Sequence, residues 1–144
     1  MANTLFPTIE IPSLTKPKRD TDIRYKKSAA WDLKRGDFIR DGAGKIETHP
    51  GRDAYLVWCI KTSMTERYAR LAYPDSIGAE LESAKQMPTR EATELALERT
   101  IREAITVNPR TEYVRDFTFE WDGDDVKVRF RVKGRNLEEY EVAV

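Results

Sequence analysis

The stretch that decides the fold is TEYVRDFTFEWDGDDVKVRFRVKG, residues 111–134. Large apolar residues alternate with polar ones on both sides of the Asp122-Gly123 step, which is the pattern of two half-buried strands joined by a tight turn. A third alternating run, residues 139–144, follows a second turn at residues 134–136. The sequence therefore predicts a three-stranded antiparallel meander at the C-terminal end of the chain.

The alternation also predicts which side chains share a face of this meander. One face should be apolar, with these members: Tyr113, Phe117, Phe119, Trp121, Val126, Val128, Phe130, Val132, Tyr140, Val142 and Val144. On the other face the middle strand carries the cations Lys127, Arg129, Arg131 and Lys133, and the flanking strands carry the acids Glu112, Asp116, Glu120, Glu139 and Glu141. Cross-strand pairs of opposite charge contribute roughly 0.2–1 kcal/mol each, so this face can neutralise itself. A binding surface is the alternative.

The segment before the meander, residues 89–106, has the pattern of an amphipathic helix. Thr89 is a suitable N-cap residue, and Glu91 lies in the first turn, where the helix dipole favours an anion. The apolar stripe consists of Leu97, Ile101, Ala104 and Ile105. We expect this stripe to pack against the sheet, and we expect the helix to stop at Asn-Pro-Arg, residues 108–110.

Upstream of this helix the sequence predicts five shorter elements. In chain order they are strands at 38–40 and 45–48, a helix over 52–64, a strand over 67–74 and a helix over 75–84. The helix over 52–64 should turn Ala54, Val57, Trp58 and Lys61 to one side, and Asp75 or Ser76 should cap the helix over 75–84. The predicted fold class is α+β: the C-terminal meander with two to three helices packed on one face.

Residues 1–30 differ from the rest of the chain. Pro7, Pro12 and Pro17 interrupt any helix, and the basic residues that follow include Lys16, Lys18, Arg19, Arg24, Lys26 and Lys27. We therefore predict an extended basic arm over residues 1–30 and a single domain over residues 31–144. The arm is either a disordered tail or a segment that becomes ordered along a neighbouring subunit.

Bulk composition excludes several classes of protein. The 25 basic residues balance the 25 acidic ones, so no global field attracts nucleic acid or an anionic membrane, and neither is an expected partner. Cys59 is the only cysteine and should be a small buried residue. No apolar run approaches the roughly 18 residues of a membrane span, and the N-terminus does not resemble a secretory signal, so we expect synthesis in the cytosol.

The sequence contains few patterns of residues that could catalyse a reaction or bind a metal or cofactor. With one histidine, His49, and one cysteine, no Cys/His zinc site can be assembled. A histidine-based triad would need His49 as its base, and nothing near His49 in the sequence suggests one. There is no phosphate-binding glycine loop, and the acidic residues lie mainly on predicted solvated faces, where the pKa of a carboxyl is not raised. We therefore predict no enzyme, no catalytic residue, no metal site and no cofactor.

Two segments make the chain similar to a known family: KTSMTERYARLAYPDSIGAEL, residues 61–81, and REAITVNPRTEYVRDFTFEW, residues 102–121. Over roughly residues 36–133 the chain resembles the small baseplate wedge proteins of contractile phage tails. These include the W-like proteins of simple myophages and prophage particles, and the related wedge subunit of type VI secretion systems. The matching positions are Thr65, Glu66, Arg67, Tyr73, Pro74, Gly78, Asn108, Pro109 and Arg110. Asn108 stands where the family has an acidic residue.

This resemblance implies a structural role. Family members form part of the wedge around the end of the tail tube and seed the contractile sheath. Their sheet is similar to the linking domain of the sheath subunit, which takes up strands from neighbours at an open edge. The implied partners are other baseplate wedge proteins, tail sheath, and tail tube or hub proteins, with multiple copies per baseplate. The implied location is the bacterial host cytoplasm during assembly, then the virion or phage-like particle.

The Asn-Pro-Arg corner has two interpretations. Pro109 fixes the exit angle of the helix, so the planar guanidinium of Arg110 could meet a carboxylate or carbonyl cluster of another chain. Alternatively, Arg110 only interacts with the last carbonyls of its own helix. Taken with the resemblance, the predicted partner-binding residues are Asn108, Pro109, Arg110, Thr65, Arg67, Lys16, Lys18, Arg19 and Arg24.

Two other functions stay open from the sequence. One is a peptidoglycan hydrolase carried by the same particle, because some relatives have carried a lysozyme label; Asn108 cannot supply the protonatable acid that this chemistry requires. The other is a cytosolic adaptor that binds acidic protein surfaces through its basic arm.

Overall fold

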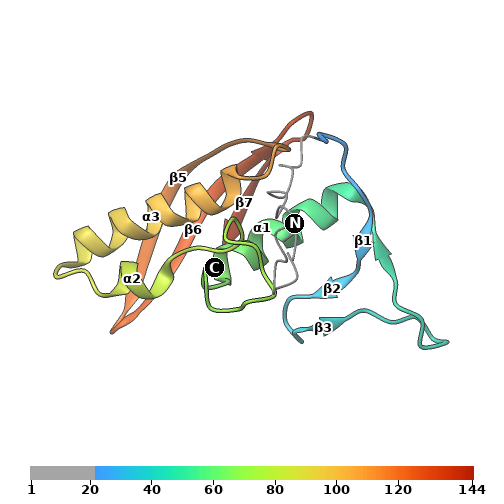
Figure 1. The fold of residues 1–144 in the computed structure, drawn as a ribbon, viewed down its shortest axis with the longest axis horizontal. Helices are drawn as coiled ribbons and strands as arrows, with labels where there is room; N and C mark the ends of the chain where they lie inside the picture. Colours follow the sequence, from blue (N-terminus) through green and yellow to red (C-terminus); the bar gives the residue numbers. More distant parts are fainter. Residues whose placement is uncertain (1–21) are drawn as a thin grey trace, which may run out of the picture.

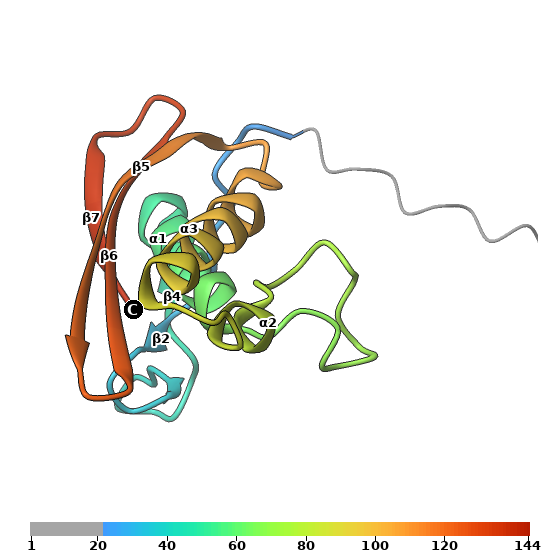
Figure 2. The same ribbon diagram turned by 90° about the vertical axis from the view of Figure 1, so that its left-hand side faces the viewer.

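The computed structural model describes residues 22–144 and confirms the α+β class. Its elements in chain order are β1 (Ser28–Ala29), β2 (Trp31–Asp32), β3 (Asp37–Phe38), β4 (Thr48–His49), α1 (Gly51–Met64), α2 (Leu81–Lys85), α3 (Arg90–Thr106), β5 (Thr111–Asp122), β6 (Asp125–Gly134) and β7 (Glu139–Ala143). The predicted meander is the antiparallel sheet β5-β6-β7. The three helices lie on one side of this sheet, and α2 packs beside α3 (Figure 1, Figure 2).

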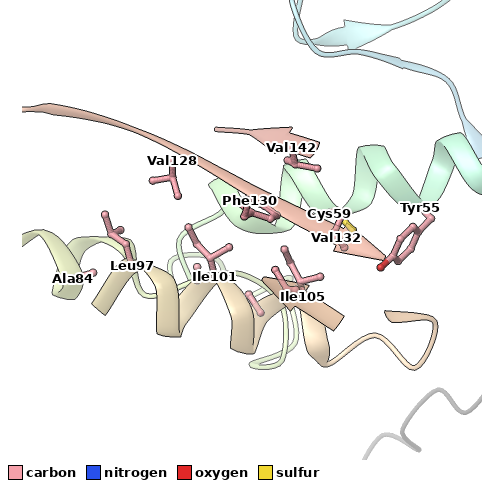
Figure 3. Close-up of a cluster of buried hydrophobic side chains, with 13 residues drawn as sticks. Tyr55, Cys59, Ala84, Leu97, Ile101, Ile105, Val128, Phe130, Val132 and Val142 are labelled. Atoms are coloured by element: carbon pink, nitrogen blue, oxygen red, sulfur yellow. The ribbon is translucent and has the colours of Figure 1, made fainter. Parts of the chain in front are cut away.

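The hydrophobic core lies between this sheet and the helices (Figure 3). Its central side chains are Val128, Phe130 and Val132 from β6, and Leu97, Ile101 and Ile105 from α3. The Phe130 ring is fully enclosed and stacks on Phe117 with 5.2 Å between the ring centroids. Burial of such a side chain stabilises the fold by about 1.5–3 kcal/mol, so this layer fixes the register of the sheet against α3.

Helix α3 agrees with the sequence prediction. The Thr89 hydroxyl accepts a hydrogen bond from the Ala92 amide at 3.2 Å, so Thr89 is the N-cap. All four members of the predicted stripe are buried, whereas Leu95 is 69 % exposed. The helix therefore packs with the predicted face inward and leaves one leucine in solvent.

The first strand of the meander contains a bulge that the alternation did not reveal. The pairing of β5 with β6 shifts between Arg115 and Thr118, and Asp116 adopts a φ of 56°. Such an extra residue reverses the order of the faces along the strand. Val114 is therefore buried, while Tyr113 lies on the outer face, where its hydroxyl donates to Glu139 at 3.2 Å. The prediction that Tyr113 shares a face with Phe117 was wrong.

Helix α1 was predicted within one residue, but its buried face was not. The buried residues are Tyr55, Cys59, Thr62 and Ser63, and the predicted member Lys61 is exposed, with its ammonium 3.6 Å from the centroid of the Trp31 ring. Tyr55 can be buried because its hydroxyl lies 2.9 Å from that of Thr111. The Thr111 hydroxyl already donates to the Ile105 carbonyl, so Tyr55 is the donor of the pair.

The single cysteine is enclosed in this core. Cys59 has no exposed surface, and burial raises the pKa of its thiol to about 12. A thiol reacts as the thiolate, so Cys59 is unreactive while the protein is folded.

Two upstream predictions were wrong. Residues 67–74 form turns and irregular chain instead of a strand, and the predicted helix over 75–84 is reduced to Leu81–Lys85. The cause is Gly78, which has a φ of 97° and interrupts any helix at that point. Neither Asp75 nor Ser76 caps α2, because Glu80 occupies the cap position.

The predicted strands near 38–40 and 45–48 do pair, through a bridge between Arg40 and Ile46. The hairpin also pairs with the chain before it: β1 with β4 and β2 with β3. Ala30, at the centre of this pairing, is 1 % exposed. Residues just before it thus belong to the folded body, and a boundary at residue 30 stays a prediction.

Candidate functional site

The free edge of strand β7 is the first feature that could bind another chain. Val144 and Val128 exchange both backbone hydrogen bonds, at 2.8 and 2.9 Å, so Val144 points its amide and carbonyl towards β6. In an antiparallel pair this orientation alternates along the strand. The backbone groups of Glu139, Glu141 and Ala143 therefore point away from β6. No described residue pairs with this side of β7, which is the end of the sheet.

The two faces of strand β7 carry side chains of different chemistry. Glu139 and Glu141 lie on the outer face, opposite Lys133 and Arg131 in the register, while Tyr140, Val142 and Val144 lie on the inner face and pack against the core. A strand added at this edge would thus meet carboxylates on one face and apolar groups on the other.

The opposite edge of the sheet, along β5, is less suitable for pairing. Its regularity is broken by the bulge at Asp116, and bulges prevent a further strand from pairing in register. In addition, the Arg102 guanidinium from α3 donates to the outward Val114 carbonyl at 3.3 Å. The sheet therefore has one regular edge, β7, and one obstructed edge, β5.

The outer face of the sheet is self-paired, as the simpler interpretation predicted. The ion pairs are Arg129–Glu120, Arg131–Asp116, Arg131–Glu139, Arg115–Glu139 and Lys133–Glu112, at 2.8–3.6 Å. Hydrogen bonds from Arg115 to Glu139 are the main reason why the pKa of the Glu139 carboxyl lies below its usual value. These side chains are 27–58 % exposed, so water weakens each pair and each contributes little to stability.

The second feature is the corner formed by Asn108, Pro109 and Arg110. The Asn108 side-chain oxygen accepts from the Arg110 amide at 3.0 Å, and the Asn108 carbonyl accepts from the Thr111 amide at 3.0 Å. Arg135, in the turn after β6, donates through Nε to the Pro109 carbonyl at 2.9 Å. An asparagine is therefore sufficient here, because its amide oxygen closes the turn without a charge.

Arg110 contacts the segment that enters the fold from the N-terminal side. Its Nε donates to the Arg24 carbonyl at 2.7 Å, and Nη1 lies 3.4 Å from the Asn108 side-chain oxygen. The Arg24 side chain points elsewhere and pairs with Asp22 at 3.1 Å. Of the predicted partner-binding residues, the structure brings together Asn108, Pro109, Arg110 and the backbone of Arg24.

Tyr25 fixes the same segment to the corner. Its hydroxyl donates to the Arg135 carbonyl at 2.8 Å and lies 3.3 Å from the Arg110 carbonyl, and its ring meets the Tyr55 ring edge-on. Gly134 lies so close to this hydroxyl that an added Cβ would collide with it. Sequence reasoning missed Tyr25, because a contact across 110 residues leaves no local signal. Lys16, Lys18 and Arg19 lie outside the described residues.

Thr65 and Arg67 belong to a different cluster, at the base of the loop between α1 and α2. The Thr65 carbonyl accepts from the Ala79 amide at 2.9 Å, and the Arg67 amide donates to the Ala79 carbonyl at 3.0 Å. The Arg67 side chain is only 11 % exposed and donates to the Gly78 carbonyl at 3.0 Å. Sequence reasoning identified these positions but assigned them to partners, whereas their contacts here close a loop.

These features define a class of protein: a small α+β domain with one regular open sheet edge and a corner that anchors the incoming N-terminal segment. A family model described as "Contractile injection system sheath initiator" matches residues 27–137. The chain belongs to this family, and its role in contractile injection systems is structural, in sheath initiation. No curated protein matches the chain significantly. Among residues 22–144, no helix has the length and apolarity to cross a membrane.

Proposed function

We propose that this protein is a baseplate wedge component that seeds the contractile sheath by accepting a strand of a sheath subunit at the β7 edge. The observation that carries the proposal is the row of outward backbone groups on Glu139, Glu141 and Ala143. Added strands gain affinity from such main-chain hydrogen bonds. Membership of the sheath initiator family supports the same role.

The side chains of β7 specify the strand that would fit. Its outer-face residues would lie beside Glu139 and Glu141, which favours lysine or arginine at alternate positions. Its inner-face residues would extend the apolar layer of Tyr140 and Val142, which favours valine, isoleucine or leucine. The proposed ligand is therefore an extended segment in which apolar and basic residues alternate.

Asn108, Pro109 and Arg110 have a positioning role in this proposal. By holding the Arg24 carbonyl, Arg110 sets the direction in which the chain leaves the domain towards its N-terminus. We propose that the basic segment with Lys16, Lys18, Arg19 and Arg24 contacts a neighbouring wedge or tube subunit from this fixed point. Thr65 and Arg67 would contribute to the contact with a neighbouring subunit indirectly, by holding the base of the loop between α1 and α2.

The particle would be phage-like, from a myophage or a prophage, with several copies of this protein in each baseplate. Assembly would take place in the cytoplasm of the bacterial host, and the protein would join wedge proteins to the tail tube. The role would require no catalysis. Release of peptidoglycan fragments by the purified protein, abolished by one carboxylate substitution, would contradict this part of the proposal.

Hydrogen exchange of individual amides tests the edge without any substitution. In the free protein the amides of Glu141 and Ala143 should exchange fast, whereas those of Tyr140 and Val142, bonded to β6, should be protected. Adding the purified sheath subunit should protect Glu141 and Ala143 as well. Unchanged exchange at both positions, with the sheath subunit shown to be bound, would overturn the assignment of this edge.

A matched pair of variants tests the consequence for assembly. Glu141→Pro removes an outward amide, while Glu141→Ala loses the same carboxylate and keeps the amide. We expect particles with Glu141→Pro to contain the protein but to form at least about tenfold fewer sheaths. A tenfold change is what the loss of one anchoring interaction would produce. Glu141→Ala should reduce sheath formation much less, because it loses only one cross-strand charge pair, which contributes roughly 0.2–1 kcal/mol, and keeps the outward amide. A folded Glu141→Pro protein that initiates sheaths at the normal rate would refute strand addition at β7.

A further inference from the structure

The loop between α1 and α2 has no role in the proposed strand addition, and it has its own architecture. It leaves the body at Thr65, returns at Ala79, and projects away from the sheet (Figure 2). All nine residues from Tyr68 to Ser76 are exposed. The side chain of Leu71, near the middle of this segment, is fully exposed, and Tyr68 and Tyr73 are 66 % and 53 % exposed.

The base of the loop is closed by a bridge between Glu66 and Ala79. Around this bridge the Glu66 carboxylate accepts from the amides of Leu81 and Glu82 at 2.9 and 3.1 Å, which satisfies the N-terminus of α2. Arg67 adds a hydrogen bond to Glu80 at 3.3 Å, and the Glu80 amide donates to the Thr100 hydroxyl of α3 at 2.6 Å. The base is therefore fixed to two helices.

The exposed part of the loop is also ordered by its own backbone. The Tyr73 amide donates to the Arg70 carbonyl at 3.1 Å, and the Ile77 amide donates to the Pro74 carbonyl at 3.0 Å, so two consecutive turns shape the tip. Tyr68 holds a φ of 66°, a conformation that is unfavourable for a bulky side chain. Backbone strain of this kind costs about 1–3 kcal/mol and persists at sites where a defined shape is needed.

We propose that this loop is a docking element that inserts Leu71 and Tyr73 into an apolar groove on a different protein chain of the particle. Exposed aromatic and aliphatic side chains on a preorganised segment are suited to anchoring, because little conformational freedom is lost on binding. The exposed segment carries one charge of each sign, Arg70 and Asp75, so the rim of that groove should carry a carboxylate beside Arg70 and a basic side chain beside Asp75.

The size of the loop argues against a second copy of this chain as the partner. A stable interface needs roughly 20–30 residues and about 800 Å² on each side, and the exposed loop has nine residues. A contact of this size is effective when other contacts hold the same two bodies together, as in an assembly of several chains. The loop is therefore one attachment of the protein to its baseplate neighbour, separate from the β7 edge that serves the sheath.

Two exposed leucines provide a matched test in the full-length protein, expressed in place of the natural gene. Leu71→Asp should reduce the amount of protein found in purified particles at least about tenfold, whereas Leu95→Asp, on the solvent face of α3, should be incorporated normally. Both purified variants should unfold within about 2 °C of the wild type, because neither side chain is buried. Normal incorporation of Leu71→Asp, or an equal loss with Leu95→Asp, would overturn the proposal.

A photo-crosslinking amino acid at Tyr73 identifies the partner even if Leu71→Asp folds poorly. We expect a crosslink to a different chain of the particle, in a peptide with apolar residues and a nearby aspartate or glutamate. A crosslink to a second copy of this chain, or none in assembled particles, would refute it. A failure of the proposed strand addition at β7 can be told apart from a failure of the loop proposal, because it would leave this crosslink intact.

Discussion

The C-terminal sheet and the loop between α1 and α2 both meet solvent, but different forces hold them. The sheet is fixed by burial, with Phe130 enclosed and Val114 pressed against the core. The loop buries almost nothing beyond its base and is held by hydrogen bonds around Glu66, Arg67 and Ala79. The comparison teaches that one small domain can present two ordered surfaces, and that a substitution can disrupt either surface without disrupting the other.

The largest expected effect is on the sheet. Phe130→Ala leaves a cavity at the centre of the core and should lower the free energy of unfolding by about 3–5 kcal/mol, measured by urea denaturation. Leu71→Ala in the loop is the control and should change it by less than about 0.5 kcal/mol. If both variants lost the same free energy of unfolding, the loop would be packed as tightly as the sheet, and the contrast between the two regions would be wrong.

A smaller loss is expected at the base of the loop. An alanine Cβ at Gly78 would lie 2.6 Å from the Thr65 carbonyl, and the φ of 97° is also unfavourable for alanine. We expect Gly78→Ala to destabilise the protein by about 1–3 kcal/mol and to speed tryptic cleavage at Arg70.

Gly44 is the matched control, with a φ of 81° but nothing within 4 Å of an added Cβ. Gly44→Ala should therefore show only the cost of the backbone conformation. If the two alanine variants lost the same stability, the close approach to Thr65 would contribute nothing to the loop.

The smallest expected effect depends on pH and concerns the outer face of the sheet. The pKa of Glu139 is lowered in the folded state, chiefly by the hydrogen bonds from Arg115. Its contribution to stability is therefore present above the unfolded-state pKa and is lost as the pH falls through the lowered one. The urea midpoint of the wild type should exceed that of Glu139→Gln slightly at neutral pH and converge with it in acid. A difference that persisted in strong acid would contradict this account.

Sequence reasoning predicted the meander and α3 because their hydrophobic patterns are long and match the faces that are buried in the fold. It predicted a strand at 67–74 from the same kind of alternation, and there it failed. Alternation creates a strand only where a partner strand is available, and the positive φ of Tyr68 and the turn at Arg70 prevent pairing. The bulge at Asp116 was missed for a related reason: it depends on the register with β6, which one strand does not encode.

The candidate site was predicted in part. The corner at Asn108, Pro109 and Arg110 was identified, but the residues that it contacts, Tyr25 and Arg135, were not, since such pairs form only when distant segments meet. Whether the corner also binds another protein stays a prediction, as does the role of the three basic residues before residue 22.

The enclosure of Cys59 has a practical consequence. Since the folded protein presents no reactive thiol of its own among residues 22–144, a cysteine introduced at the exposed Ala72, beside the proposed docking residues, or at Ala143 becomes the single point of attachment for a fluorescent dye. Two singly labelled proteins would then report separately, and in real time, on baseplate attachment and on the arrival of the first sheath subunit. The order of these two events in assembly becomes measurable without altering the core.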